Sequence, residues 1–187
     1  PDQASNNYSF TFTEGDSRTA ISDASGTSLA DVDSSSFDKV TVTWVVSAFA
    51  DGTSERLFVA NSSNNSGATA QIILGNKPDG ATPTGTFTLN SVVYVVSGLV
   101  ADGTATINIT GDNGDELSTE AVETFLDAVR YKNNSDNPTS SSDRAISIQV
   151  EDGSGSISNI ATSTITVVGV NDAPTISLGT SAGTFTE

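Results

Sequence analysis

The side chains of this sequence that could do chemistry are almost all carboxylates and amides. The 187-residue chain has 23 Asp and Glu against 7 Lys and Arg, a net charge of −16, and no cysteine or histidine. It therefore lacks a thiolate nucleophile, a Ser-His-Asp triad and any imidazole or thiolate metal ligand. Carboxylate and amide oxygens are the ligands that Ca²⁺ prefers. The composition points toward hard cations and argues against a nucleic-acid partner, whose phosphates need clustered Lys and Arg.

Paired carboxylates can also serve a glycosidase, which needs an acid and a base on either side of one bond. Sugar-binding clefts usually contain aromatic platforms, and aromatic residues make up only 6% of this chain. The single Trp44 alternates in phase with Val40 and Val42, which favours a core position over a ligand platform. Nothing in the sequence brings two carboxylates into an aromatic cleft, so we expect no catalytic residues and no enzymatic activity.

The elements that must position these carboxylates are predominantly β-strands. Apolar and polar residues alternate with a period of two in stretches such as 8–13, 40–45, 105–110, 145–150 and 164–168. Thr and Val supply most of these positions, as expected for a pleated surface. Asp-Gly pairs between the stretches are turn signals. Many short strands with turns at this spacing predict an all-β sandwich.

One segment has a helical period instead. Its apolar residues follow the spacing i, i+3, i+4, i+7, at Val122, Phe125, Leu126 and Val129. Ser118 is a suitable N-cap, and acidic residues follow in the first turns, where the helix dipole favours negative charge. This pattern predicts a short helix at Thr119–Ala128 that leads into a strand.

The two ends of the chain share a short motif. Thr11–Glu14 reads TFTE and recurs as Thr184–Glu187, and Pro1 and Pro174 stand at the same offset. A repeat of this kind predicts a tandem array of similar modules.

We interpret residues 1–173 as one complete module and residues 174–187 as the linker and first strand of the next. No signal sequence opens the chain, and we expect it to be a segment of a longer polypeptide. It has no apolar run of membrane-spanning length, so we expect no membrane insertion.

The junction between these modules resembles that of a known family. Residues 169–174, GVNDAP, are similar to the junctions of bacterial cadherin-like repeats, which fill the long central regions of Gram-negative surface adhesins secreted by the type I, repeats-in-toxin route. The resemblance extends to residues 12–15, to the DxD-type turn at 31–34, to the passage 129–139 and to the closing hairpin 144–168. It implies an immunoglobulin/cadherin-like Greek-key β-sandwich.

The resemblance does not cover the middle of the chain. Shorter members of the family lack an equivalent of about residues 61–91, which are rich in Asn, Ser, Gly and Thr and contain two strand-like stretches. The family does not indicate what this central segment does.

The resemblance also implies where calcium binds, because ligand oxygens of cadherin-like tandem modules collect where two domains meet. The matching positions here are Glu14, Asp31, Asp33, Asp152, Asn171 and Asp172. A first strand that ends before Glu14 and a last strand that ends before Asn171 bring these two residues to the same end of a sandwich. The alternative is that all these positions are ordinary turn residues, because Asp and Asn side chains bond their own backbone in turns.

A further acidic run, residues 112–116, could also hold a metal. It lacks the spacing of an EF-hand loop. We favour a charge cluster that complements the start of the following helix.

The function that these features predict is a calcium-rigidified extender module of a secreted bacterial surface adhesin. Its partners would be neighbouring repeats of the same chain, its location the extracellular surface of a Gram-negative bacterium, and the isolated module would be monomeric. The alternative is that residues 61–91 form a binding face for a glycan or protein on a host or biofilm surface.

Overall fold

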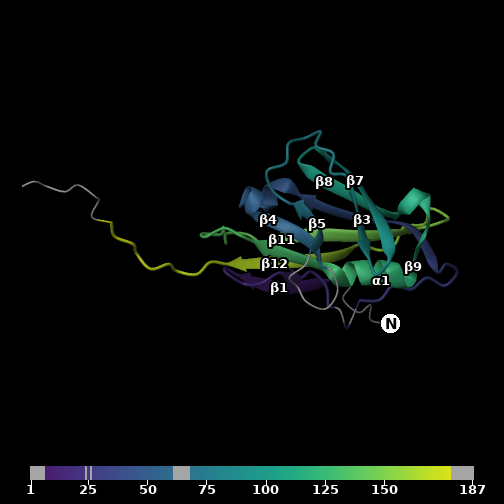
Figure 1. Cartoon of the computed structure of the whole chain (residues 1–187), viewed down its shortest axis with the longest axis horizontal. Helices are drawn as coiled ribbons and strands as arrows, with labels where there is room; N and C mark the ends of the chain where they lie inside the picture. Colours follow the sequence, from purple (N-terminus) through teal and green to yellow (C-terminus); the bar gives the residue numbers. More distant parts are fainter. Residues whose placement is uncertain (1–6, 24, 26, 61–67, 178–187) are drawn as a thin grey trace, which may run out of the picture.

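Two β-sheets packed face to face form the body of the protein, and an α-helix lies along their side (Figure 1). The structure, a computed structural model, describes residues 7–23, 25, 27–60 and 68–177. The expectation of an all-β, immunoglobulin-like sandwich with one short helix is confirmed in this part of the chain. The proposed repeat of TFTE at Thr184–Glu187 and the residue Pro1 lie outside the described residues.

The larger sheet has eight strands. Their spatial order is β1 (Tyr8–Thr13), β12 (Ala161–Val168), β11 (Arg144–Asp152), β3 (Ser36–Val45), β8 (Thr104–Gly111), β7 (Val92–Ala101) and β6 (Gly85–Leu89), with the short β9 (Leu117–Ser118) paired to β3. Adjacent strands in this sheet are antiparallel except for β1 and β12, which run parallel. The parallel pair means that β1 and β12 finish at the same end of the sandwich.

The smaller sheet has four strands and is antiparallel throughout. Their order is β2 (Thr19–Ala20), β10 (Val129–Asn133), β4 (Glu55–Ala60) and β5 (Ala68–Ile73). In the described part of the chain, three short 3-10 helices lie in connections between strands, at η1 (Val46–Ala48), η2 (Gly52–Ser54) and η3 (Asp112–Gly114).

The strands of the central segment are built into both sheets. β5 is an edge strand of the smaller sheet and pairs with β4, while β6 is an edge strand of the larger sheet and pairs with β7. Phe87 and Leu89 of β6 are buried in the core. In its described part, residues 68–91, the segment therefore widens the sandwich instead of standing apart from it.

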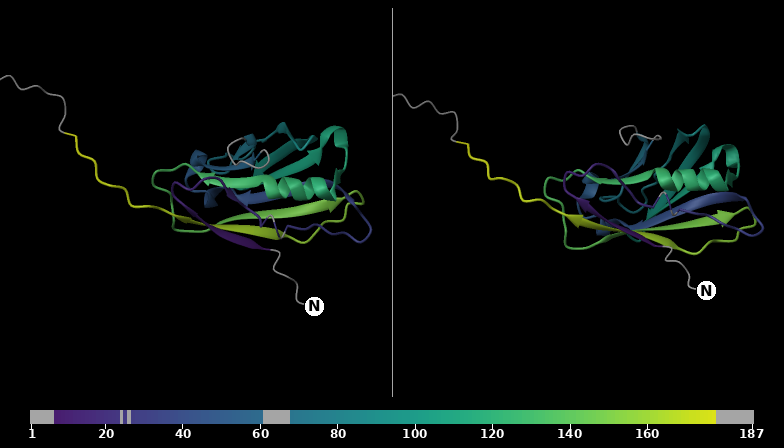
Figure 2. Two further views of the ribbon diagram at one scale, coloured as in Figure 1. Left: turned by 60° about the horizontal axis from the view of Figure 1, so that its bottom comes forward. Right: turned by 90° about the horizontal axis from the view of Figure 1, so that it is seen from below.

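The helix α1 occupies Thr119–Ala128, as the sequence predicted. The Ser118 hydroxyl accepts a hydrogen bond of 3.2 Å from the backbone N–H of Ala121, which satisfies one of the free donors at the helix start. Val122 and Phe125 are buried, and the helix lies along the side of the molecule between the two layers (Figure 2). No helix in the described residues is long and apolar enough to cross a membrane.

The buried apolar side chains of both sheets and of α1 form one cluster. Trp44 belongs to it, with 2% of its surface exposed, and its indole N–H donates to the carbonyl of Leu74 at 2.8 Å. The expected core position of Trp44 is confirmed. Between β7 and β8, Asp102 and Gly103 both have positive φ, at 50° and 71°, which is the geometry of a tight hairpin turn.

Candidate functional site

Strand directions divide the candidate calcium ligands between two opposite ends of the sandwich. β1 and β12 finish together, and the chain leaves there toward Asn171 and Asp172 (Figure 1). We call this the exit end, and Glu14 lies there because it directly follows β1. β11 runs antiparallel to β12, so Asp152 at its close lies at the opposite end, which we call the far end.

At the exit end, Glu14 fixes the start of the segment that leaves the sandwich. Its backbone N–H donates to the carbonyl of Val168 at 2.8 Å, and its Oε2 accepts a 2.8 Å hydrogen bond from the backbone N–H of Val170. Gly169, between these two partners, lies beside the Glu14 carboxylate and the ring of Pro138. The chain is therefore held for two residues beyond the end of β12.

Asn171 and Asp172 follow this segment and are exposed, outside any strand. The amide of Asn171 donates to the backbone carbonyl of Asp172 at 3.2 Å, which is a local contact. The expected grouping of Glu14 with these two residues at one end agrees with the structure. Their role as calcium ligands stays a prediction.

A buried charge network lies in the core behind the exit end, and no local pattern in the sequence indicates it. Arg144, at the start of β11, is fully buried, and its guanidinium donates to Glu55 Oε1 at 2.8 Å and to Asp51 Oδ2 at 3.2 Å. The Tyr131 hydroxyl donates to the same Glu55 oxygen at 2.6 Å. Burial, followed by the charge of Glu55, raises the pKa of Tyr131, so the phenol stays protonated and continues to donate.

Asp51 connects this network to the loop beside the exit segment. Its Oδ1 accepts from the Thr139 hydroxyl at 2.7 Å and from the Thr139 backbone N–H at 2.9 Å, and its Oδ2 accepts from the Asn133 amide at 2.7 Å. Burial alone would raise the pKa of Asp51, but these hydrogen bonds and the charge of Arg144 outweigh it and lower the pKa. Thr139 directly follows Pro138, which lies near Gly169, so the hydrogen bonds from Thr139 to Asp51 anchor this loop to the core.

At the far end, Asp31 and Asp33 form an exposed pair of carboxyl groups. The backbone N–H of Asp33 donates to Asp31 Oδ1 at 3.2 Å. The hydrogen bond between the two carboxyl groups lowers the pKa of Asp31 and raises that of Asp33, and the negative charge of Asp152 opposes ionisation of both. These three predicted ligands are therefore close enough to interact electrostatically.

Asp152 also organises the loop that joins β11 to β12. Its Oδ1 accepts hydrogen bonds from the Ser154 backbone N–H at 2.8 Å, the Ser154 hydroxyl at 2.7 Å and the Ser156 backbone N–H at 2.8 Å. The hydrogen bonds from Ser154 and Ser156 lower the pKa of Asp152. The donors to Oδ1 of Asp152 all come from its own loop, so this oxygen behaves as expected for an ordinary turn residue.

Glu116 is a further acidic residue at the far end. From the sequence, Glu116 is expected only as part of the charge cluster before the helix. Its Oε2 accepts a hydrogen bond from the Ser36 hydroxyl, and its Oε1 lies against Gly153, the residue after Asp152. No local signal shows this proximity, because it arises from the pairing of β9 and β11 on either side of β3.

Neither end forms a closed metal site by itself. Within the described residues, no group of three or more acidic side chains is arranged so that it could hold a metal ion. Calcium takes roughly six to eight oxygens in proteins. A calcium site at either end would therefore need further oxygens from backbone carbonyls, from water or from a neighbouring module.

Comparisons with known proteins assign no family to the chain. No protein-family model, no curated protein and no solved structure matches it. The resemblance of residues 169–174 to the junctions of bacterial cadherin-like repeats therefore stays a prediction.

Proposed function

We propose that the chain is a calcium-rigidified extender module of a long secreted bacterial surface adhesin. The observation that carries the proposal is the direction in which the chain passes through the sandwich. Candidate ligands occupy both ends, and the chain leaves from only one of them. Because β1 begins at the far end, with Tyr8 opposite Ser163, the exit end of one module would face the far end of the next in a tandem array.

The charge of the chain supports a role for a divalent cation at that junction. A net charge of −16 makes modules of this kind repel one another. Salt screens charges beyond about 8 Å at physiological ionic strength, but carboxylates brought closer than this at a junction still repel. A bound Ca²⁺ would neutralise these carboxylates and take oxygens from both modules, which would fix their relative orientation.

The fixed exit segment supports a mechanical role as well. The hydrogen bonds from the Val170 N–H to the Glu14 carboxylate and from the Glu14 N–H to the Val168 carbonyl hold the chain where it leaves the sandwich. Pro174 lacks a backbone N–H and has a restricted φ, so it stiffens the linker without joining a sheet. In this proposal the partners are neighbouring repeats, and the location is the extracellular surface of a Gram-negative bacterium.

The experiment that tests the proposal compares two-module proteins, with residues 1–173 in tandem, by small-angle scattering in calcium and in chelator. The wild-type protein should be longer in calcium. Asp172→Ala should abolish this extension while the melting temperature of the single module is unchanged, because Asp172 lies beyond the last strand and buries no core surface.

Glu120→Ala is the matched control, because Glu120 is exposed on the first turn of α1 and its loss removes the same charge. This variant should extend like the wild type. Equal maximum dimensions for the wild-type and Asp172→Ala proteins in calcium would contradict the proposal.

A further inference from the structure

A groove of about 440 Å³ opens at the side of the sandwich, at the edge where β1, β12 and β11 lie. Its wall on the larger sheet comes from β11 and β12, and its opposite wall comes from the loop after β2 and from Leu126 of α1. This volume lies within the usual range of small-molecule sites, about 300–1,000 Å³.

The groove exists because the two sheets differ in width. The larger sheet has eight strands and the smaller has four, and β2 at the edge of the smaller sheet has only two residues. A loop and α1 therefore cover the inner faces of β11 and β12 in place of a further strand. Ile148 of β11 remains partly exposed there, although its neighbours on the same face, Ile146 and Val150, are buried.

The groove contains a buried hydroxyl group without a hydrogen-bond partner. Ser163 of β12 lines the groove and is only 2% exposed, and its Oγ has no partner among the described residues. Two other serine hydroxyls in the lining have partners: Ser22 donates to the Leu126 carbonyl at 3.1 Å, and Ser158 donates to the Asn159 carbonyl at 2.8 Å. Burying an unpaired hydroxyl is unfavourable, and exceptions in folded proteins call for a specific explanation.

The charges of the groove restrict the ligand. No Lys or Arg lines it, and Asp23 is its single charged lining residue within the described part of the chain. Arg130, nearby in β10, donates to the backbone carbonyls of Asp127 and Val129. An anionic ligand would therefore be repelled by Asp23 and would find no cation in the lining.

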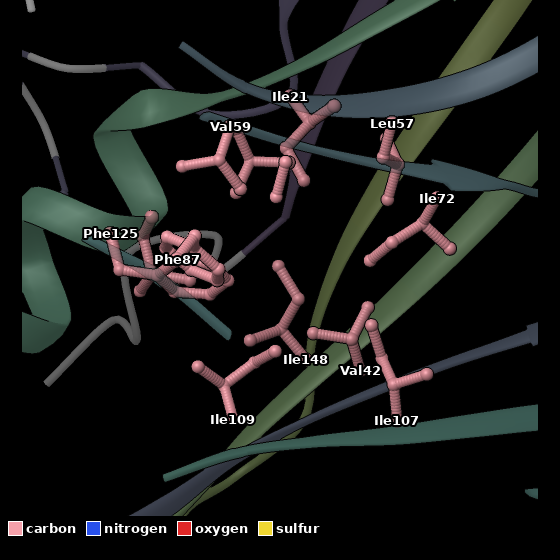
Figure 3. Close-up of a pocket in the computed structure, with 13 residues that line it drawn as sticks. Ile21, Val42, Leu57, Val59, Ile72, Phe87, Ile107, Ile109, Phe125 and Ile148 are labelled. Carbon is pink, nitrogen blue, oxygen red and sulfur yellow. The ribbon is translucent and has the colours of Figure 1, made fainter. Parts of the chain in front are cut away.

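The remaining surface combines an apolar floor with polar edges. Ile21, Leu126 and Ile148 form part of the floor and also border a small, entirely apolar cavity of about 20 Å³ deeper in the core (Figure 3). Residues with hydroxyl or amide side chains, including Ser28 and Asn159, line the edges, together with Tyr8. An uncharged ligand with one apolar face and several hydroxyl groups matches this distribution, and a pyranose sugar has this chemistry.

We propose that the groove binds an uncharged sugar unit of a glycan. The Ser163 oxygen is covered in the free protein, and on binding its side chain rotates toward the groove and forms a hydrogen bond with a hydroxyl of the sugar. This activity goes beyond the spacer function and does not depend on calcium. It also differs from a glycan site on the central segment, because none of that segment's described residues, 68–91, lines the groove.

The experiment is a heteronuclear NMR titration of the whole chain with glucose, galactose and N-acetylglucosamine, and with glucuronate as the anionic probe. At least one neutral sugar should shift the amide signals of groove residues at millimolar concentrations, both in calcium and in chelator. Glucuronate should shift none of them.

Two variants and a control locate the site. Ala161→Phe places a large side chain at a partly exposed position in the groove lining and should abolish binding. Ser163→Val removes the hydroxyl and should weaken binding about tenfold, the effect of one lost hydrogen bond. Thr164→Val, the next residue on β12, points to the other face of the sheet and should bind like the wild type.

Melting curves establish that each variant is folded, and Ala161→Phe serves as the decisive variant if Ser163→Val is unstable. Absence of any neutral-sugar binding to the wild-type chain would overturn the proposal. Binding that persists in Ala161→Phe, or signals that shift in residues 68–91 instead of the groove, would overturn it as well. None of these outcomes bears on the calcium-dependent extension of the two-module protein, so the two proposals can fail separately.

Discussion

The carboxylate of Glu14 accepts a 2.8 Å hydrogen bond from the backbone N–H of Val170, a residue 156 positions later in the chain. This contact ties the segment that leaves the sandwich to the end of its first strand. It places a carboxylate beside the linker, and it restrains the direction in which the chain departs.

Replacement of Glu14 should separate these two roles. Glu14→Gln keeps an oxygen that can accept from Val170 but removes the negative charge, so the linker should stay ordered while calcium-dependent extension of a two-module protein is lost. Glu14→Ala should lose both. The heteronuclear NOE of Val170 measures the order, and scattering measures the extension. Full extension of Glu14→Gln in calcium would show that the carboxylate charge is not needed.

Calcium should raise the melting temperature of the protein. A ligand that binds only the folded state at a hundredfold excess over its Kd adds about 2.7 kcal/mol. For a domain of this size that is a rise of roughly 5–10 °C. The rise should be larger per module in the two-module protein, because there the exit end meets a far end. Identical melting curves of both proteins in calcium and in chelator would count decisively against calcium binding.

Loss of the buried cation should strongly destabilise the sandwich. Arg144→Met leaves the carboxylates of Glu55 and Asp51 in the core without their positive partner, at a cost of about 3–5 kcal/mol. Arg56→Met is the control, since Arg56 makes exposed hydrogen bonds and its loss should cost less than about 1 kcal/mol. Urea unfolding measures both values. Similar costs for the two variants would show that the network contributes little.

The stability of the protein should fall in acid, partly through Asp51. Because the pKa of Asp51 is lowered on folding, its contribution is present above the unfolded pKa of about 3.9 and is lost as the pH falls through the folded value. In Asp51→Asn the loss of stability below about pH 5 should be shallower. Urea unfolding at a series of pH values measures this slope.

Asp127→Asn is a control for that pH series, because folding shifts the pKa of Asp127 in the opposite direction to that of Asp51. Burial raises the pKa of Asp127, and its Oδ1 has no partner among the described residues. Its contribution to stability is therefore present below the unfolded pKa and is lost as the pH rises through the folded one. The variant should be more stable than the wild type at neutral pH. Parallel pH slopes for wild type, Asp51→Asn and Asp127→Asn would contradict both assignments.

Asp152 offers a test of the turn role against the ligand role. Asp152→Ala removes the acceptor of three hydrogen bonds in the β11–β12 loop and should cost about 1–3 kcal/mol. Asp152→Asn keeps an Oδ1 acceptor and should cost much less. Asp31→Ala, at the exposed far end, is the control for loss of a nearby carboxyl group. If Asp152→Asn keeps both stability and the calcium response, Asp152 is a turn residue and not a ligand.

Local elements of this protein follow from the sequence alone. The period-two stretches predicted the positions of β1, β3, β8, β11 and β12, and the helical period with Ser118 predicted the bounds of α1. These predictions succeed because backbone geometry fixes which side chains share a face of a strand or helix within a few residues. The Asp-Gly turn at Asp102 is predictable for the same reason, since Gly103 tolerates positive φ.

Only the tertiary structure decided how these elements bring distant residues together. The order of strands across the sheets places Asp152 and Glu14 at opposite ends, and it brings Arg144 to Glu55 across 89 positions of sequence. It also leaves the groove beside Ser163, because the smaller sheet is too narrow to cover the larger one. Strand order depends on pairing and packing between segments far apart in the chain, and periodicity within a segment carries no information about that partner choice.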